Sequence, residues 1–259
     1  MGHLVWNIDP EIVRLGPIAL RWYGLMFASG FLCGYLVFIR IYRREKRSEA
    51  NVSSLFTYIF LGTIIGARLG DVILYDPAFY LEHPWEIPMV WHGGLASHGG
   101  FIGVLVAIYL YVRKYPEMSF LQLADRLALP SLVCATFIRL GNFFNSEIVG
   151  RPSNLAWAVV FPRVDDVPRH PEMLYEAIAY AIAFAVLYAV YLKSRILEVS
   201  GRLFGAALAI CFTARFFLEF VKEDQVAFER GLPFNSGQLY SVPFIVLGLF
   251  LLLRARGQS

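Results

Sequence analysis

Residues 21–39 read RWYGLMFASGFLCGYLVFI, an apolar run whose only charged side chain stands at its first position. A basic block follows directly, at Arg40, Arg43, Arg44, Lys46 and Arg47. A helix of about 20 predominantly apolar residues is long enough to cross a bilayer. The run therefore predicts a transmembrane helix over about residues 17–39 that ends in a basic loop.

The rest of the chain repeats this pattern. The sequence is 58% hydrophobic and 17% charged, whereas soluble proteins average about 45–50% apolar and about 25% charged residues. The apolar excess gathers in six further blocks, at about residues 54–74, 95–112, 121–144, 173–192, 203–221 and 238–253. A soluble protein could not cover so much apolar surface. We expect an all-α polytopic integral membrane protein with a single transmembrane catalytic domain over residues 1–259.

The loops between the seven blocks alternate in charge. Basic residues follow the first, third, fifth and seventh blocks, and acidic or mixed loops follow the second, fourth and sixth. Because basic loops are retained in the cytoplasm, the pattern predicts seven transmembrane helices with the N-terminus outside and the C-terminus cytoplasmic. The net charge of +3 is spread over these loops, so we expect no nucleic-acid partner.

The N-terminal residues and the three cysteines have ordinary structural interpretations. The first sixteen residues are polar, show no cleavage pattern after an early apolar core, and predict an amphipathic or extended leader before a first span that stays in the membrane. Cys33, Cys134 and Cys211 each lie in an apolar run without metal-type spacing. They predict buried reduced thiols and no metal site.

The densest polar motif is RLGNFFNSEIVG, at residues 139–150. Ionisable groups at membrane depth cost several kcal/mol and are usually functional. Arg139 and Asn142 are three residues apart and share one helix face, and Asn145 and Glu147 continue the motif. A guanidinium beside amides suits an anion, because arginine presents a planar fork of donors. Snorkelling of Arg139 to the interface is the alternative, but it does not account for the neighbouring polar residues.

His98 lies between two glycine pairs in GGLASHGG, near the outer end of its block. An ordinary histidine pKa of about 6.5 suits proton transfer, although a hydrogen-bonded packing role is the alternative. Arg68 and Asp71 in GARLGD are three residues apart and predict an ion pair on one helix face. That pair is equally consistent with a structural and with a substrate-binding role.

Further polar side chains share this side of the predicted bilayer. Arg215 and Glu219 in ARFFLEF are four residues apart and could form a structural pair toward mid-span. The topology places six residues in the outer half: Tyr23, His98, Arg139, Glu147, His170 and Glu176. Together they predict an outward-facing chamber that accepts an anionic lipid headgroup.

RLGNFFNSEIVGR, together with SHGG, RWYGLM, HPEMLYE and ARFFLEF, resembles the prolipoprotein diacylglyceryl transferase family, from Trp22 to the closing SGQLYSVP segment. The resemblance implies a seven-helix bacterial inner-membrane enzyme with an outward N-terminus. Such an enzyme moves the diacylglyceryl group of phosphatidylglycerol to the lipobox cysteine thiol of a prolipoprotein. It forms a thioether, releases glycerol phosphate and begins lipoprotein maturation. The resemblance implies no metal or organic cofactor, and we expect a monomer.

The resemblance also implies roles for single residues. It makes His98 and Arg215 catalytic and makes Arg139 a phosphatidylglycerol-binding residue. Tyr23 also matches a position on which the family depends, and our hypothesis is that it orients a proton. Four more positions match ones on which the family depends and are assigned to substrate binding: Asn142, Glu147, Gly150 and Glu219. Met173 replaces a frequent glutamine and Ser97 a frequent aromatic residue, and neither change touches the proposed chemistry.

Two questions stay open at the level of sequence. The base that takes the thiol proton is either His98 or a phosphate polarised by an arginine. A secondary transporter of a small anionic solute is the rival function, since polar residues near mid-membrane also mark substrate paths, but we find no inverted repeat. An intramembrane protease lacks its motifs here, and a receptor-like protein would not require the arginine and amide cluster.

Overall fold

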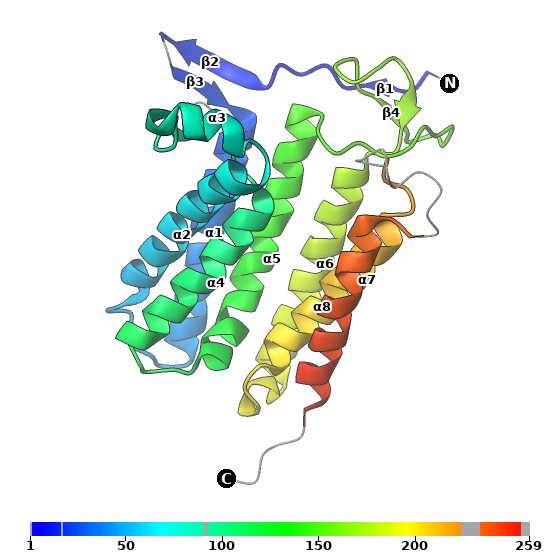
Figure 1. Ribbon diagram of the computed structural model, residues 1–259. Coiled ribbons are helices and arrows are strands. Elements are labelled where there is room, and N and C mark those ends of the chain that lie inside the picture. Colours follow the sequence, from blue (N-terminus) through cyan, green and yellow to red (C-terminus); the bar gives the residue numbers. More distant parts are fainter. Residues whose placement is uncertain (1, 17, 91–92, 224–233, 255–259) are drawn as a thin grey trace. The chain divides into compact units, whose positions relative to one another are not determined.

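The computed structural model describes residues 2–16, 18–90, 93–223 and 234–254. Within them, seven helices of 17 to 26 residues lie at the seven predicted blocks. They are α1 (Trp22–Arg44), α2 (Val52–Leu74), α4 (Ser97–Lys114), α5 (Phe120–Asn145), α6 (Glu172–Lys193), α7 (Arg202–Leu218) and α8 (Ser236–Leu253) (Figure 1). A short helix, α3 (Pro77–Glu82), and the 3-10 turns η1 (Pro84–Glu86) and η3 (Ile196–Glu198) connect them.

Five of the long helices, α1, α2, α5, α6 and α8, are long and apolar enough to cross a membrane. This confirms a mostly helical, multi-pass membrane protein. Of the other two, α4 ends on Arg113 and Lys114, and α7 has only 17 residues. The number of seven crossings and the orientation of the termini stay predictions.

The prediction of an all-α fold was wrong in one respect, because the described residues also form five short strands. β1 (Leu4–Val5) pairs in parallel with β4 (Val159–Val160), which pairs antiparallel with β5 (Pro168–Arg169). β2 (Glu11–Leu15) and β3 (Ile18–Arg21) form a separate antiparallel hairpin. The predicted leader and the polar loop before α6 therefore contain short strands. The lengths of the apolar runs, from which the helices were predicted, do not indicate these strands.

Two helix boundaries also differ from the prediction. α1 begins at Trp22 rather than near residue 17, because residues 18–21 pair with β2, and it continues through the basic block to Arg44. α7 ends at Leu218 rather than near residue 221, because the chain turns there and Lys222 forms a β-bridge with Gly150.

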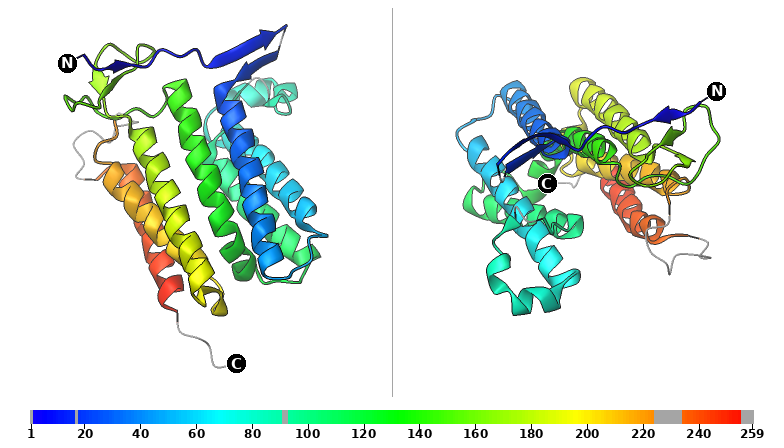
Figure 2. Two further views of the ribbon diagram at one scale, coloured as in Figure 1. Left: turned by 180° about the vertical axis from the view of Figure 1, so that it is seen from behind. Right: turned by 90° about the horizontal axis from the view of Figure 1, so that it is seen from above.

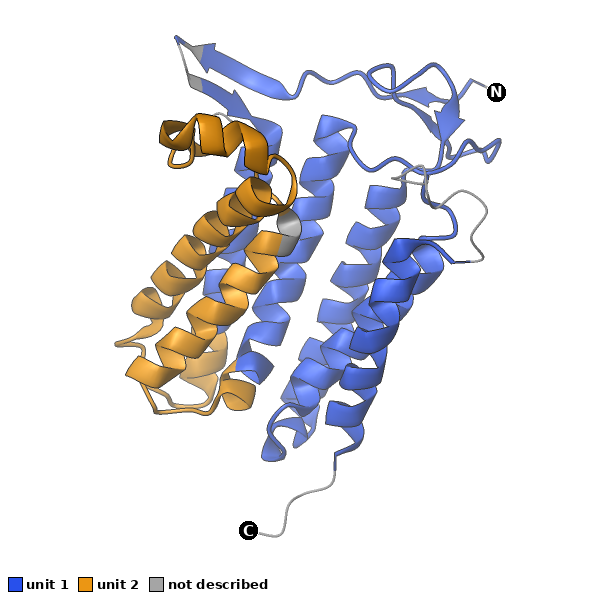
Figure 3. Ribbon diagram, in the orientation of Figure 1, with its two compact units in different colours: residues 1–38, 124–259 blue, residues 39–123 orange. Residues whose placement is uncertain are grey.

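The chain divides into two compact units, residues 39–123 and residues 1–38 with 124–259 (Figure 3). The prediction of one domain over residues 1–259 stays a prediction, and each unit is described by itself.

In the unit of residues 39–123, α2 and α4 pack closely through glycines. Gly62, Gly66 and Gly70 recur every four residues on α2 and face Gly99 and Gly103 on α4. A Cβ atom on Gly62 would lie 2.6 Å from the carbonyl oxygen of Gly103. Membrane helices associate through such small residues because these let the backbones approach.

Arg68 in this unit has a structural role. Its guanidinium donates to five backbone carbonyls of the segment after α3: Glu86, Ile87, Met89, Gly93 and Gly94. Asp71 lies 4.0 Å from the Arg68 Nη1 atom and accepts a 2.9 Å hydrogen bond from the Tyr80 hydroxyl. The predicted pair is therefore weak. Of the two roles left open by the sequence, the contacts support the structural one.

In the other unit, α6, α7 and α8 run side by side (Figures 1 and 2). The buried carboxylate of Asp125 on α5 accepts hydrogen bonds from the amides of Gly201 (2.7 Å) and Phe204 (2.9 Å). These amides lie at the start of α7, where helix N–H groups lack partners within the helix. Asp125 therefore fixes the start of α7 against α5.

An apolar cluster in this unit includes Val159 of β4. Its members are Phe143, Val149, Val159, Phe161 and Met173, with Trp6 and Leu174 against it. The Trp6 indole donates a 3.0 Å hydrogen bond to the carbonyl of Phe143. Met173 is fully buried, so the residue that replaces the family's frequent glutamine packs in this cluster. The cluster holds the N-terminal segment over the ends of α5 and α6 (Figure 2).

Candidate active site

The end of α5 shapes the first part of the site. Ser146 follows the last helical residue with a φ of 56°. Its amide donates to the Phe143 carbonyl (3.1 Å), and the Glu147 amide donates to the Asn142 carbonyl (3.0 Å). This pair of bonds is the Schellman motif, which satisfies the last carbonyls of a helix. It brings Glu147 back beside Asn142, five residues earlier in the chain.

The side chains of the motif are hydrogen-bonded in series. The Asn142 and Asn145 amide groups each donate a 3.0 Å bond to one oxygen of the Glu147 carboxylate. The Asn142 side-chain oxygen accepts a 3.2 Å bond from the Arg139 Nη1 atom. The prediction that Arg139 and Asn142 share one face is confirmed. Glu147 thus orients the side-chain amide of Asn142, and this amide orients the guanidinium of Arg139.

Arg139 also pairs with a residue that the sequence could not assign to it. Its Nε atom forms an ion pair with the Glu176 carboxylate on α6, which is completely buried. The Nη1 atom of Arg215, on α7, lies 3.9 Å from the other Glu176 oxygen. Two arginines from different helices therefore flank one buried carboxylate, and Arg215 remains 30% exposed.

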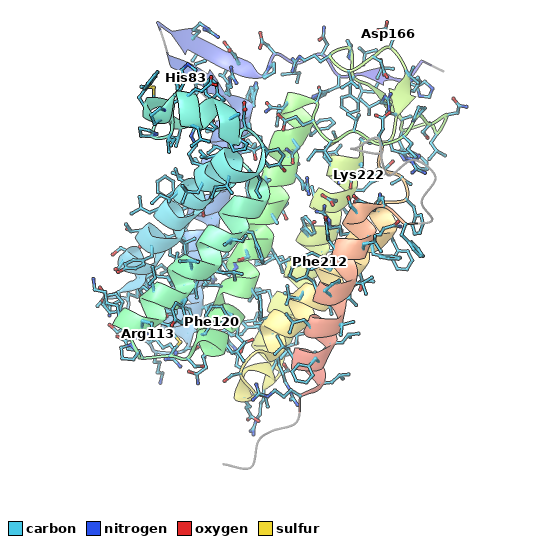
Figure 4. The ribbon with its side chains drawn as sticks, in the orientation of Figure 1. His83, Arg113, Phe120, Asp166, Phe212 and Lys222 are labelled. Carbon is cyan, nitrogen blue, oxygen red and sulfur yellow. The ribbon has the colours of Figure 1, made fainter. Side chains whose placement is uncertain are left out.

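The possible pairing of Arg215 with Glu219 was wrong. Glu219 instead accepts hydrogen bonds of 3.2 and 3.3 Å from the Lys222 ammonium group, and both side chains are buried. Lys222 lies just after the turn that follows α7 (Figure 4), and its role was not predicted. The available signal was its position three residues after Glu219, but the sequence placed it in a loop.

Tyr23 lies against the motif. A Cβ atom on Gly141 would be 2.9 Å from Cδ2 of the Tyr23 ring. The ring therefore rests on the α5 backbone between Arg139 and Asn142, where only a glycine leaves room for it. This position agrees with a role beside the arginine, and the proposed orientation of a proton stays a prediction.

Gly150 has a packing role. Its amide donates a 2.9 Å bond to the His170 carbonyl, and the next amide, of Arg151, donates 2.8 Å to the Val221 carbonyl. A Cβ atom on Gly150 would lie 2.6 Å from Cβ of His170 and 2.7 Å from the Val221 oxygen. Gly150 thus lets three segments meet at the start of α6 and the end of α7. Direct contact with substrate stays a prediction.

Arg169 holds these segments together through its hydrogen bonds. The buried Arg169 guanidinium donates to both Asp165 oxygens, to the Gly150 carbonyl (3.2 Å) and to Glu223 (2.8 Å). Its hydrogen bonds to Asp165 hold the pKa of that carboxyl below its usual value. The role of Arg169 was not predictable from sequence, because its partners lie in loops.

Glu172 is the third residue, after Lys222 and Arg169, whose role was not predicted from the sequence. It begins α6 and is completely buried, and neither carboxyl oxygen has a hydrogen-bond partner within the described chain. The charged side chains with the largest electrostatic effects on it are Glu176, Lys222, Arg139 and Glu219. A glutamate in HPEMLYE was visible in the sequence, but only the fold puts it among these charges.

His98 is the second residue of α4, in the unit of residues 39–123. Its side chain lies outside the described residues, so its proposed part in catalysis stays a prediction. Among the described residues, no group of three or more His, Cys, Asp or Glu side chains could hold a metal ion. The three cysteines are free and half-buried.

The arrangement is suited to an anion. The guanidinium groups of Arg139 and Arg215 converge on the Glu176 carboxylate. They lie toward the same end of the helices as the side-chain amides of Asn142 and Asn145. Phosphate and carboxylate oxygens use the same arginine donors. A lipid phosphate could therefore share Arg139 and Arg215 with Glu176 in a low-dielectric setting, where such contacts are stronger than in water.

Comparisons with known proteins identify the family of the chain. Residues 10–254 match the family model described as prolipoprotein diacylglyceryl transferase. A phosphatidylglycerol–prolipoprotein diacylglyceryl transferase of Tolumonas auensis is 50% identical over 250 residues, 96% of each chain. Those of Chloroherpeton thalassium (45% identical, 100% of this chain and 96% of the relative) and Bacteroides fragilis (42%, 95% and 93%) are also similar. The chain therefore belongs to the prolipoprotein diacylglyceryl transferase family.

Proposed function

We propose that this protein transfers the diacylglyceryl group of phosphatidylglycerol to the lipobox cysteine of a prolipoprotein. The observation that carries the proposal is the placement of Arg139 and Arg215 on opposite oxygens of buried Glu176. Family membership supports the reaction and gives no support to a transporter of small anions. We further propose seven crossings, an outer N-terminus and a monomer in the bacterial inner membrane.

The reaction breaks the bond between a glyceryl carbon and a phosphate oxygen and forms a carbon–sulfur bond. The lipobox thiol loses its proton and attacks as a thiolate, which is the nucleophilic form. Glycerol phosphate leaves with the bonding electrons on its oxygen. Arg139 and Arg215 stabilise the charge that develops on this phosphate.

The other residues act around these two arginines. Asn142 and Glu147 hold the Arg139 guanidinium in place through their hydrogen bonds. Glu219, paired with Lys222, stabilises the end of α7 next to Arg215, and Gly150 keeps the neighbouring segments close. His98 or the arginine-bound phosphate accepts the thiol proton, and Tyr23 orients it.

The test uses purified full-length protein in vesicles that contain phosphatidylglycerol, with a lipobox peptide as acceptor. We expect a mass increase of the peptide by one diacylglyceryl group, and none with Arg139→Ala. Arg14→Ala, which removes an exposed arginine of the β2–β3 hairpin, is the control and should transfer normally. Normal transfer by Arg139→Ala would refute the assignment of Arg139.

The same assay addresses the base. If His98 accepts the thiol proton, His98→Gln should lose transfer throughout pH 6 to 9, because glutamine cannot take up a proton. Turnover near the wild-type level across this range would leave the phosphate as the acceptor.

A further inference from the structure

Glu172 is a buried acid for which the proposed reaction has no use. Its side chain is completely buried, and both oxygens lack a hydrogen-bond partner within the described residues. Burying an ionised carboxylate without partners is costly, and such a group takes up a proton instead. Glu176, one helical turn later, is also buried, and a second negative charge so close adds to that cost.

The surroundings of Glu172 form a charge cluster of three cations and three carboxylates. Its members are Arg139 from α5, Glu172 and Glu176 from α6, and Arg215, Glu219 and Lys222 from α7 and the turn after it. Of these, Glu176, Lys222, Arg139 and Glu219 have the largest electrostatic effects on Glu172. Arg215 lies 3.9 Å from Glu176.

The protonation of Glu172 decides the net charge of this cluster. With Glu172 ionised, the three cations and three carboxylates cancel. With Glu172 protonated, one positive charge remains. A phosphodiester carries one negative charge, so only the protonated cluster becomes neutral when the lipid binds. The ionised cluster would keep an uncompensated negative charge in a low-dielectric site.

We propose that Glu172 carries a proton in the form of the protein that binds phosphatidylglycerol, and thereby sets the charge cluster to match one phosphodiester anion. The inference rests on the proposed function, because it requires the lipid phosphate to bind at Arg139 and Arg215. Glu172 acts through the charge of the cluster and is a positioning residue. The proton comes from water, and no covalent step is involved.

The experiment measures the binding of a water-soluble short-chain phosphatidylglycerol to detergent-solubilised full-length protein by calorimetry, from pH 6 to 9.5. Wild-type affinity should be constant at low pH. It should then fall by about tenfold per pH unit once Glu172 ionises in the free protein, as linkage requires for one proton. Repeating the titration in buffers with different ionisation heats should show about one proton taken up per lipid at the alkaline end.

Glu172→Gln replaces the acid with a neutral group of the same shape. Its affinity should stay near the low-pH wild-type value throughout the range. Asp166→Asn is the matched control, because it removes one negative charge from an exposed loop residue of the same unit (Figure 4). This control should keep the wild-type pH dependence. Glu172→Ala is a second neutral variant in case the glutamine is not accommodated.

Several outcomes would overturn the inference. A flat wild-type affinity from pH 6 to 9.5, without proton uptake, refutes it whatever the variants do. A wild-type pH dependence that persists in the neutral variants assigns the proton to another group, such as Lys222. Absence of binding at every pH, or equal binding by Arg139→Ala, refutes the proposed function and this inference together. Binding that needs Arg139 but ignores pH refutes this inference alone.

Discussion

Replacing Arg139 by alanine should destabilise the protein as well as stop lipid transfer. Glu176 is completely buried, and the Arg139 side chain is 13% exposed. Removal of one partner from a buried ion pair costs about 3–5 kcal/mol, because the other charge stays buried and unpaired. Arg215 remains 3.9 Å from Glu176, so we expect the lower end, about 3 kcal/mol.

This loss should appear as a lower melting temperature. For chains of this size, 1 kcal/mol corresponds to about 2–4 °C, so Arg139→Ala should melt about 6–12 °C below the wild type. The measurement is thermal unfolding in detergent, followed by intrinsic fluorescence. Arg14→Ala breaks an exposed ion pair with Glu11 and should leave the melting temperature unchanged, since exposed pairs contribute little.

The double variant Arg139→Ala/Glu176→Gln separates stability from function. A neutral amide at position 176 does not need a buried cation, so most of the lost melting temperature should return. Transfer to the lipobox peptide should stay absent, because the phosphate still lacks Arg139. If the double variant regains transfer, Arg139 has only a structural role. If Arg139→Ala melts like the wild type, the buried pair does not stabilise the fold.

Three further changes test other parts of the structure by the same melting assay. Gly150→Ala should cost about 1–3 kcal/mol through overpacking, because its Cβ would lie 2.6 Å from that of His170; an unchanged melting temperature would contradict this close packing. Arg68→Lys should cost about 1–3 kcal/mol, since an ammonium group cannot serve all five carbonyls; wild-type stability would dismiss the carbonyl network. Asp165→Asn should melt below the wild type at pH 7. The difference should shrink as the pH falls below about 4. Arg169 lowers the pKa of Asp165 in the folded state, so the stabilising effect is fully present above the unfolded pKa and is lost as the pH falls through the folded pKa. A difference that does not begin to shrink below about pH 4 would argue against this linkage.

The helices were predictable from sequence because each depends on a local property, the length of an apolar run. The strands were not predictable from sequence. β1 pairs Leu4 with Val159, far apart in the chain, and a strand of two residues is too short to show a periodic pattern. The same limit applies to helix ends. The β2–β3 hairpin takes the first residues of the apolar run that begins near residue 17, and composition alone does not reveal this.

The candidate site divides in the same way. The series Arg139, Asn142 and Glu147 was predictable, because all three lie within one helix end. The partner of Arg139 was not predictable, since Glu176 comes from α6. The partner of Glu219 was not predictable either, because Glu219 pairs with Lys222 and not with Arg215. Sequence spacing can suggest pairs within one helix. Competition between those pairs and partners from other helices is settled only by the fold.

The backbone after α5 explains why this motif can serve both as a helix end and as part of the site. Glu147 stands between two residues with positive φ, Ser146 at 56° and Ile148 at 58°. The Schellman motif accounts for Ser146, but a β-branched residue in this region is an outlier that costs on the order of 1–3 kcal/mol. Such strain persists only where the surroundings impose it. Here the next residues are fixed, because Gly150 is bonded to His170 and Arg151 to Val221. The chain must therefore turn sharply at Ile148. That turn keeps the Glu147 carboxylate directed at Asn142, while the backbone after it bonds to the segments near Glu172.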